Sequence, residues 1–186
     1  GTLIGVTTKY FNAANVDTNG IDIELSYENN TNFGLLNVGL RGTHILEYEI
    51  PGSNGSAIDV VGLFNHDNFA RSLPETKIVL NTSLSNNNHT VALYGRYVSD
   101  YSTTRPLSAS AKDAGFDQKI DQWITFDLQY SYSFNLLGND IRLSIGGNNI
   151  LDEDVPIVYD AANFSYDPKH HDPRGRLFYF GLKLIR

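Results

Sequence analysis

The sequence predicts an all-β fold in which antiparallel strands follow one another up and down a single sheet. Segments of alternating apolar and polar residues recur along the 186 residues, and helical periodicity is nearly absent. The connections between these segments alternate between short and long. All six prolines fall in or at the rim of the long connections, because proline cannot donate a hydrogen bond to a strand pair.

The segment WITFDLQYSYSF, at 123–134, is the clearest of these strands. A strand turns successive side chains to opposite faces, so strict alternation indicates one apolar and one polar face. The first face would carry Ile124, Phe126, Leu128, Tyr130, Tyr132 and Phe134, and the second Thr125, Asp127, Gln129, Ser131 and Ser133. The apolar face must touch either a protein core or lipid.

The same alternation predicts seven strands in all. Their approximate ranges are 7–28, 34–49, 75–86, 89–102, 122–135, 140–151 and 176–185. The first range is long enough to suggest a bulge near Asn15.

The lengths of the connections indicate whether the apolar face contacts a protein core or lipid. Three are short and rich in Asn, Gly and Asp, at 29–34, 86–88 and 135–140, as in tight hairpin turns. Three are long, at roughly 51–74, 103–121 and 152–176. A soluble sandwich has no physical reason to keep all its long loops at one end, whereas an outer-membrane barrel has short periplasmic turns and long outer loops. The sequence therefore predicts an up-and-down transmembrane β-barrel segment.

Aromatic residues are expected at both edges of such a lipid-facing band. Near the short turns lie Tyr27, Tyr130, Tyr132 and Phe134, and near the long loops lie Tyr48, Tyr97 and Tyr101. We interpret them as two aromatic girdles.

Composition excludes several other classes. The net charge is −7 without a basic patch, so a nucleic-acid partner is not expected. The chain has no cysteine, which excludes disulfides and thiolate chemistry. It contains no nucleophile elbow, dinucleotide fingerprint or phosphate loop, so we expect neither an enzyme nor a cofactor site.

An odd number of strands predicts that the chain is part of something larger. Bacterial single-chain barrels have even strand numbers, and the sequence begins GTLIG without methionine. We therefore expect residues 1–186 to be the C-terminal part of one barrel domain, with its C-terminus in the periplasm.

The final third of the chain has a characteristic pattern after the sixth predicted strand, with Asn149, Asp152 and Pro156. It resembles the C-terminal segment of TonB-dependent outer-membrane receptors, in which the penultimate strand ends in Asn, two apolar residues, Asp and then Pro. A long loop and an aromatic closing strand follow, here Gly175, Arg176, Phe178 and Phe180. Residues 10–27 also look like an inner strand of this family.

The resemblance implies a barrel of about 22 strands whose lumen holds a plug. The plug domain and the N-terminal strands would lie outside this chain. It implies energy-coupled uptake of a bulky, scarce nutrient, such as a ferric siderophore, cobalamin or a glycan, across the outer membrane of a Gram-negative bacterium. The expected partners are outer-membrane lipid, the plug domain and the extracellular nutrient. TonB is expected to act on the barrel through the plug.

Candidate ligand contacts lie in the last long loop. His170 and His171, with Asp167 and Asp172 nearby, could bind a metal, but a solvated loop is favoured and no metal site is expected. With Arg174 they are possible ligand contacts. The acids at 152–154 could bind Ca²⁺, although the expected position is the rim of the membrane.

Three polar residues of the predicted strands are candidate contacts for the lumen or the plug: Asp127, Gln129 and Arg142. Asp127 and Arg142 fall on the inward face of adjacent strands, and we expect an ion pair between them.

Two alternatives remain open. The first is a different outer-membrane barrel, such as a passive porin or a small barrel, which an upstream plug domain would exclude. The second is a soluble all-β ligand-binding module, which membrane partitioning would exclude.

Overall fold

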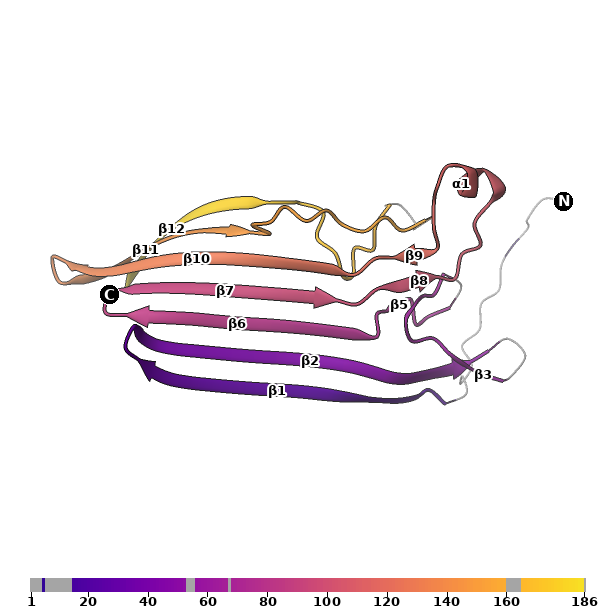
Figure 1. The fold of residues 1–186 in the computed structure, drawn as a ribbon, viewed down its shortest axis with the longest axis horizontal. Helices are drawn as coiled ribbons and strands as arrows, with labels where there is room; N and C mark the ends of the chain where they lie inside the picture. The colour runs from indigo at the N-terminus through magenta and orange to yellow at the C-terminus, as the bar shows by residue number, and fades with distance from the viewer. Residues whose placement is uncertain (1–4, 6–14, 53–55, 67, 160–164, 186) are drawn as a thin grey trace.

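The computed structural model describes residue 5 and residues 15–52, 56–66, 68–159 and 165–185. The described chain forms an antiparallel up-and-down sheet, as predicted (Figure 1). Its seven long strands are β1 (Asp17–Thr31), β2 (Gly34–Pro51), β6 (Thr76–Asn86), β7 (His89–Val98), β10 (Trp123–Leu136), β11 (Asn139–Asn148) and β12 (Leu177–Ile185). They lie in the sheet in the order in which they occur in the chain, and the short β3 (Ala57–Asp59) pairs with β2.

The three short turns lie together at one end of the sheet, beside the C-terminus, and the long connections lie at the other end (Figure 1). Residues with positive φ form the turns, namely Gly34, Asn87, Leu137 and Gly138. Glycine and asparagine tolerate this backbone better than most residues. The predicted separation of short turns from long loops is therefore confirmed.

The strand register collects the apolar residues on one face, here called the apolar face. Leu128 of β10 pairs with Leu93 of β7 on one side and with Gly147 of β11 on the other. The same register places Ile21, Ile23, Leu25, Tyr27, Leu36, Val38, Leu40, Ile78, Leu80, Leu84, Val91, Leu93, Tyr97, Ile124, Phe126, Leu128, Tyr130, Tyr132, Phe134, Ile141, Leu143, Ile145, Phe178, Phe180, Leu182 and Leu184 together.

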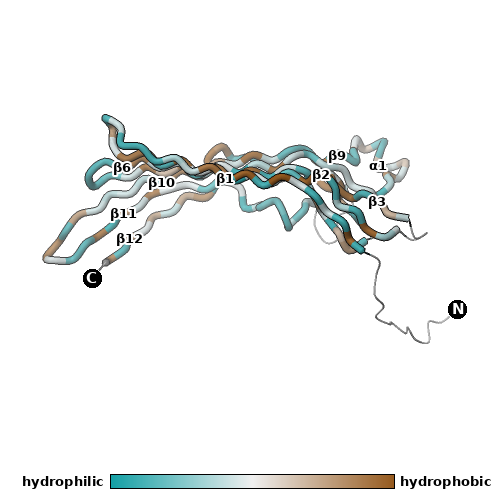
Figure 2. The backbone as a smooth tube through the Cα atoms, turned by 90° about the horizontal axis from the view of Figure 1, so that it is seen from below, coloured by the Kyte–Doolittle hydropathy of each residue, from teal (hydrophilic) through white to brown (hydrophobic). Residues whose placement is uncertain are grey.

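Many of these side chains touch no other layer. Leu128 is 41% exposed, Leu25 59% and Phe180 71%. Figure 2 shows hydrophobic and hydrophilic positions alternating along the strands. Burying a side chain of this size gains about 1.5–3 kcal/mol, and the described residues leave much of this gain unrealised across the seven strands.

The opposite face, here called the polar face, carries most of the charged residues of the strands. The register groups Asp22, Glu24, Glu28, Asn37, Arg41, Lys77, Asn81, Arg96, Thr125, Asp127, Gln129, Arg142 and Lys183 on it. Arg41 bonds Glu24 at 2.8 Å across β1 and β2.

The first strand differs from the prediction. Among the described residues it begins at Asp17, and the part of the predicted strand at 7–14 lies outside them. The register irregularity falls between Asn19 and Gly20 rather than near Asn15. A Cβ on Gly20 would lie 2.7 Å from the carbonyl oxygen of His44, so this close approach of two strands requires glycine.

The long loops contain structure that the alternation did not predict. β4 (Leu63–Phe64), β5 (Ser72–Leu73), β8 (Tyr101–Thr103) and β9 (Lys119–Ile120) form a second, four-stranded sheet. A short helix, α1 (Ala109–Asp113), is capped at its N-terminus by Ser108, whose hydroxyl accepts a hydrogen bond from the amide of Ala111. No described helix is long and apolar enough to cross a membrane.

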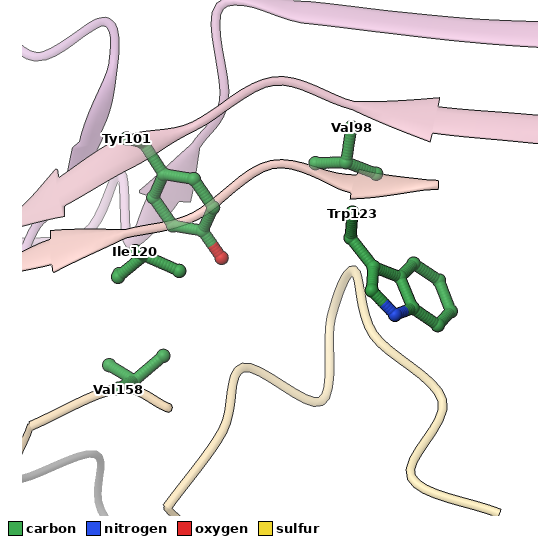
Figure 3. Packing of buried hydrophobic residues seen from close by; sticks show 5 residues of the cluster. All are labelled: Val98, Tyr101, Ile120, Trp123 and Val158. Carbon is green, nitrogen blue, oxygen red and sulfur yellow. The ribbon is translucent and has the colours of Figure 1, made fainter. Parts of the chain in front are cut away.

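The main hydrophobic core lies where this second sheet joins the strands. Val98, Tyr101, Ile120, Trp123 and Val158 pack there (Figure 3). The prediction of Tyr101 in an aromatic girdle is wrong, because β7 ends at Val98 and Tyr101 is only 3% exposed inside this core.

The sheet does not close on itself. Among the described residues, no strand pairs with the outer edge of β1 or of β12.

Candidate functional site

The connection between β11 and β12 folds back over the polar face instead of projecting into solvent. Between this connection and strands β7 and β10 lies a cavity of about 360 Å³, here called the loop cavity. It is lined by Arg96, Trp123, Thr125, Asp127, Asn148, Asn149, Pro168, Lys169, His170, His171, Asp172, Arg174, Gly175 and Leu177.

An ion pair forms the floor of the cavity. Arg96 on β7 bonds Asp127 on β10 at 2.7 Å, and the other oxygen of Asp127 accepts the backbone amide of Asn149 at 2.9 Å. The predicted pair between Asp127 and Arg142 is wrong, because the register brings Arg142 opposite Ser133, to which its Nε donates at 3.1 Å. Asp127 therefore ties three chain segments together.

Three buried side chains at the cavity have polar atoms without a hydrogen-bond partner among the described residues. They are the indole nitrogen of Trp123, the hydroxyl of Thr125 and both ring nitrogens of His171. Their residues are 5%, 2% and 4% exposed. A buried polar group without a partner costs about 1–3 kcal/mol, so this concentration at one cavity makes the loop cavity the candidate site.

His171 is uncharged at neutral pH. Burial lowers its pKa to about 4, and the nearby His170 acts in the same direction against the opposing charge of Asp167. Its ring packs against Trp123 at 5.4 Å and Tyr101 at 6.2 Å between centroids. A neutral imidazole has one N–H donor and one nitrogen acceptor. The expectation of a solvated histidine pair is therefore wrong for His171.

The far end of the loop is held by Asp167, which is 2% exposed. The hydroxyl of Tyr101 donates to its carboxylate at 2.7 Å. The pKa of Tyr101 is raised, mainly by burial and in addition by the negative charge of this carboxylate. Lys169 donates to the carbonyl of Ser72 in β5 at 3.0 Å. The roof of the cavity is thus fixed to the second sheet.

Replacing Tyr101 by phenylalanine should loosen this roof. The Tyr101→Phe change removes a hydrogen bond to a buried carboxylate, a loss of about 1.5–3 kcal/mol, and hydrogen exchange of the amides at 165–172 should accelerate. Tyr97→Phe is the matched control, because Tyr97 lies on the apolar face. Equal exchange in the two variants would show that Asp167 does not depend on this hydroxyl.

Acid should open the same roof. The pKa of His171 is 6.5 when solvated and about 4 when folded, so an opened loop binds a proton that the closed loop rejects. Stability of the closed loop is therefore full above pH 6.5, falls as the pH drops toward 4 and levels below it. The protection factors of the amides at 165–172, which compare each exchange rate with its intrinsic rate at the same pH, should fall from pH 7.5 to pH 5, and His171→Gln should weaken this dependence. An unchanged pH dependence in His171→Gln would contradict the assignment.

The residues of the C-terminal motif close the base of the loop. Asp152 accepts the amide of Arg176 at 2.9 Å and contacts its guanidinium at 3.3 Å. The side chain of Asn149 bonds both the amide and the carbonyl of Glu153, at 3.0 and 2.9 Å. Asn149, Asp152 and Gly175 all have positive φ. The motif therefore builds a compact loop base, and Asp152 serves that structure.

Alanine at Gly175 should destabilise the loop base. Its φ of 64° costs an L-residue about 1–2 kcal/mol, so Gly175→Ala should increase proteolysis within 149–159 and 165–176. Gly39→Ala is the control, because the nearest atom to an added Cβ there is 3.9 Å away and its φ is not positive. The opposite order of sensitivity would contradict this reading of the motif.

The remaining predicted residues lie on different surfaces. Phe178 and Phe180 lie exposed on the apolar face, and Pro156 is half-buried in the loop. Gln129 is on the polar face, where it accepts the hydroxyl of Tyr179 at 2.9 Å. Arg174 lines the cavity and pairs with Asp172. Of the residues proposed for ligand or lumen contact, the structure brings His170, His171, Arg174 and Asp127 together, and leaves Gln129 and Arg142 outside the cavity.

Sequence reasoning did not single out several lining residues of the cavity, among them Arg96, Trp123 and Thr125. Alternation placed Thr125 on the same face as Asp127, which was the available signal. Their meeting with His171 depends on the folding back of the loop, which alternation does not encode.

The described residues contain no group of three His, Asp or Glu side chains that could hold a metal ion. Comparison of the chain with protein-family models, with curated proteins and with solved structures found no match.

Proposed function

We propose that this chain is the C-terminal part of an outer-membrane, TonB-dependent receptor that takes up a scarce nutrient. The uncovered apolar face, continuous across seven strands, carries the proposal. Lipid is the partner that satisfies such a face without a second protein layer, and strands of 9–11 residues or more can cross the hydrocarbon core.

The two ends of the sheet support an orientation. Short turns suit the periplasmic side, and the structured long loops, with the loop cavity beneath one of them, suit the outside. Ligand would then reach the cavity from the medium. The polar face lines the lumen in this arrangement, where it would meet a plug.

The free edges of β1 and β12 support membership of a larger barrel. Unpaired backbone groups in lipid cost several kcal/mol each, so both edges need further strands. The loop base formed by Asn149, Asp152, Gly175 and Arg176 gives a structural role to the motif that resembles the receptor family.

Single cysteines test the topology in a full-length background without other cysteines, to which residues 1–186 contribute none. In intact cells that make the full-length protein, Ser110→Cys in the 103–121 loop should react with a membrane-impermeant maleimide. Asn88→Cys in a short turn should react only after the outer membrane is permeabilised. Both positions are exposed. Reaction of both in intact cells, or of neither, would refute the proposal.

Growth tests the energy coupling. Cells that lack this gene and cells that lack TonB should fail on the same growth-limiting nutrient, while a high concentration of that nutrient rescues both. Uptake that continues without TonB would favour a passive porin.

A further inference from the structure

The loop cavity has more hydrogen-bond donors than its own acceptors can use. Arg96, Lys169 and Arg174 line it together with two carboxylates, Asp127 and Asp172. Asp127 already accepts from Arg96 and from Asn149. Arg174 holds Asp172 through its Nε, which lies 2.9 and 3.0 Å from the two carboxylate oxygens, and through a terminal nitrogen that donates to one of them. Among the lining residues, three cations therefore face two carboxylates, and both carboxylates already accept hydrogen bonds.

Arg96 is the cation best placed to meet a ligand. Its side chain is 48% exposed while that of its partner Asp127 is 13% exposed. An arginine has five N–H donors, and the pair with Asp127 joins one terminal nitrogen. A guanidinium oriented in this way by a buried carboxylate can bind a second carboxylate through two parallel hydrogen bonds.

The buried atoms next to Arg96 suit hydroxyl groups. Thr125 lies directly opposite Arg96 in the register of β7 and β10, and its hydroxyl can donate and accept. Trp123 offers one N–H, and neutral His171 offers one donor and one acceptor. Alternating donors and acceptors are the complement of a chain of hydroxyl groups, each of which also donates and accepts.

From this arrangement we propose that the loop cavity binds a small hydroxylated carboxylate, such as a sugar acid. Arg96 holds the carboxylate, and Thr125, Trp123 and His171 hold the hydroxyls. The volume of about 360 Å³ is within the usual range for small-molecule sites. This inference rests on the proposed function and deepens it, because it names the chemical group, a hydroxylated carboxylate, by which the receptor would recognise a larger nutrient.

Calorimetry on the full-length protein in detergent tests the proposal, with galacturonate as the probe. Galacturonate should bind with a measurable dissociation constant, and galactose, the neutral analogue, should bind at least about 10-fold more weakly because it lacks the charged partner for Arg96. Equal affinity for the two sugars, or no binding of galacturonate, would overturn the proposal.

The Thr125→Val variant separates binding from folding. It keeps the shape of the side chain and removes an unpartnered hydroxyl, so the ligand-free protein should melt at a higher temperature while galacturonate binds about 10-fold more weakly. Thr43→Val is the matched control, because Thr43 lies on the polar face outside the cavity and bonds Asp22 at 2.7 Å. It should leave the affinity unchanged. A lower melting temperature for Thr125→Val, or unchanged affinity, would overturn the assignment.

Failure of this inference can be told apart from failure of the proposed function. Binding in detergent needs neither TonB nor an oriented membrane. Correct cysteine labelling with no galacturonate binding would refute the ligand class alone. Binding together with the wrong labelling pattern would refute the membrane receptor alone.

Discussion

Arginine in place of Leu128 should greatly reduce the amount of full-length protein assembled in the outer membrane. Leu128 lies on the apolar face near the middle of β10, and it is 41% exposed in the described chain. In the proposed barrel it faces lipid, where a basic side chain near the bilayer midplane costs about 2–4 kcal/mol. The measurement is the fraction of the protein that migrates as a folded, heat-modifiable band in outer-membrane fractions.

The neighbouring residue provides the control. Gln129 points to the polar face and is half-buried beside Tyr179, so Gln129→Arg places the same charge one position along the same strand, but on the lumen side. The assembled fraction should fall far less than in Leu128→Arg. If both variants assemble equally well, the assignment of inside and outside is wrong.

Alanine in place of Asp127 should detach the last long loop from the polar face. The change leaves Arg96 without its counter-ion and the amide of Asn149 without its acceptor, two bonds of 2.7 and 2.9 Å. Loss of hydrogen bonds to a charged group costs about 1.5–3 kcal/mol. Hydrogen exchange should therefore accelerate across 149–159 and 165–176, the described parts of the connection.

An exposed ion pair on the same face serves as the control. Glu24 and Arg41 are bonded at 2.8 Å, but their side chains are 67% and 73% exposed. Solvent weakens such pairs to about 0–1 kcal/mol, so Glu24→Ala should change exchange little at any site. A similar local effect in both variants would show that burial of Asp127 contributes nothing to loop closure.

Alternation in the sequence predicted which residues of each long strand share a face. A strand has a period of two, so a single segment such as 123–134 fixes the faces of its own side chains. The structure adds that the apolar faces of all seven long strands coincide, because the turns set a register that never slips by one residue between neighbouring strands. Only the irregularity at Asn19 and Gly20 interrupts it.

The partners of individual charges could not be predicted in this way. Asp127 and Arg142 share a face, yet Asp127 pairs with Arg96. Arg96 lies on β7, the other neighbour of β10, two residues beyond the position opposite Asp127. Alternation gives the face of a residue but not its height along the sheet, which depends on turn length and register. Alternation therefore cannot predict on which of its two neighbouring strands a charged residue finds its partner.

The sequence by itself determined the strands, their two faces and the separation of short turns from long loops, because these depend on local backbone chemistry and on a period of two. Only the tertiary structure decided that the last loop folds inward, that Tyr101 and Asp167 anchor it, and that Trp123, Thr125 and His171 meet at one cavity. Those contacts join residues far apart in the chain, and their energies come from burial and hydrogen bonding between elements that no local pattern relates.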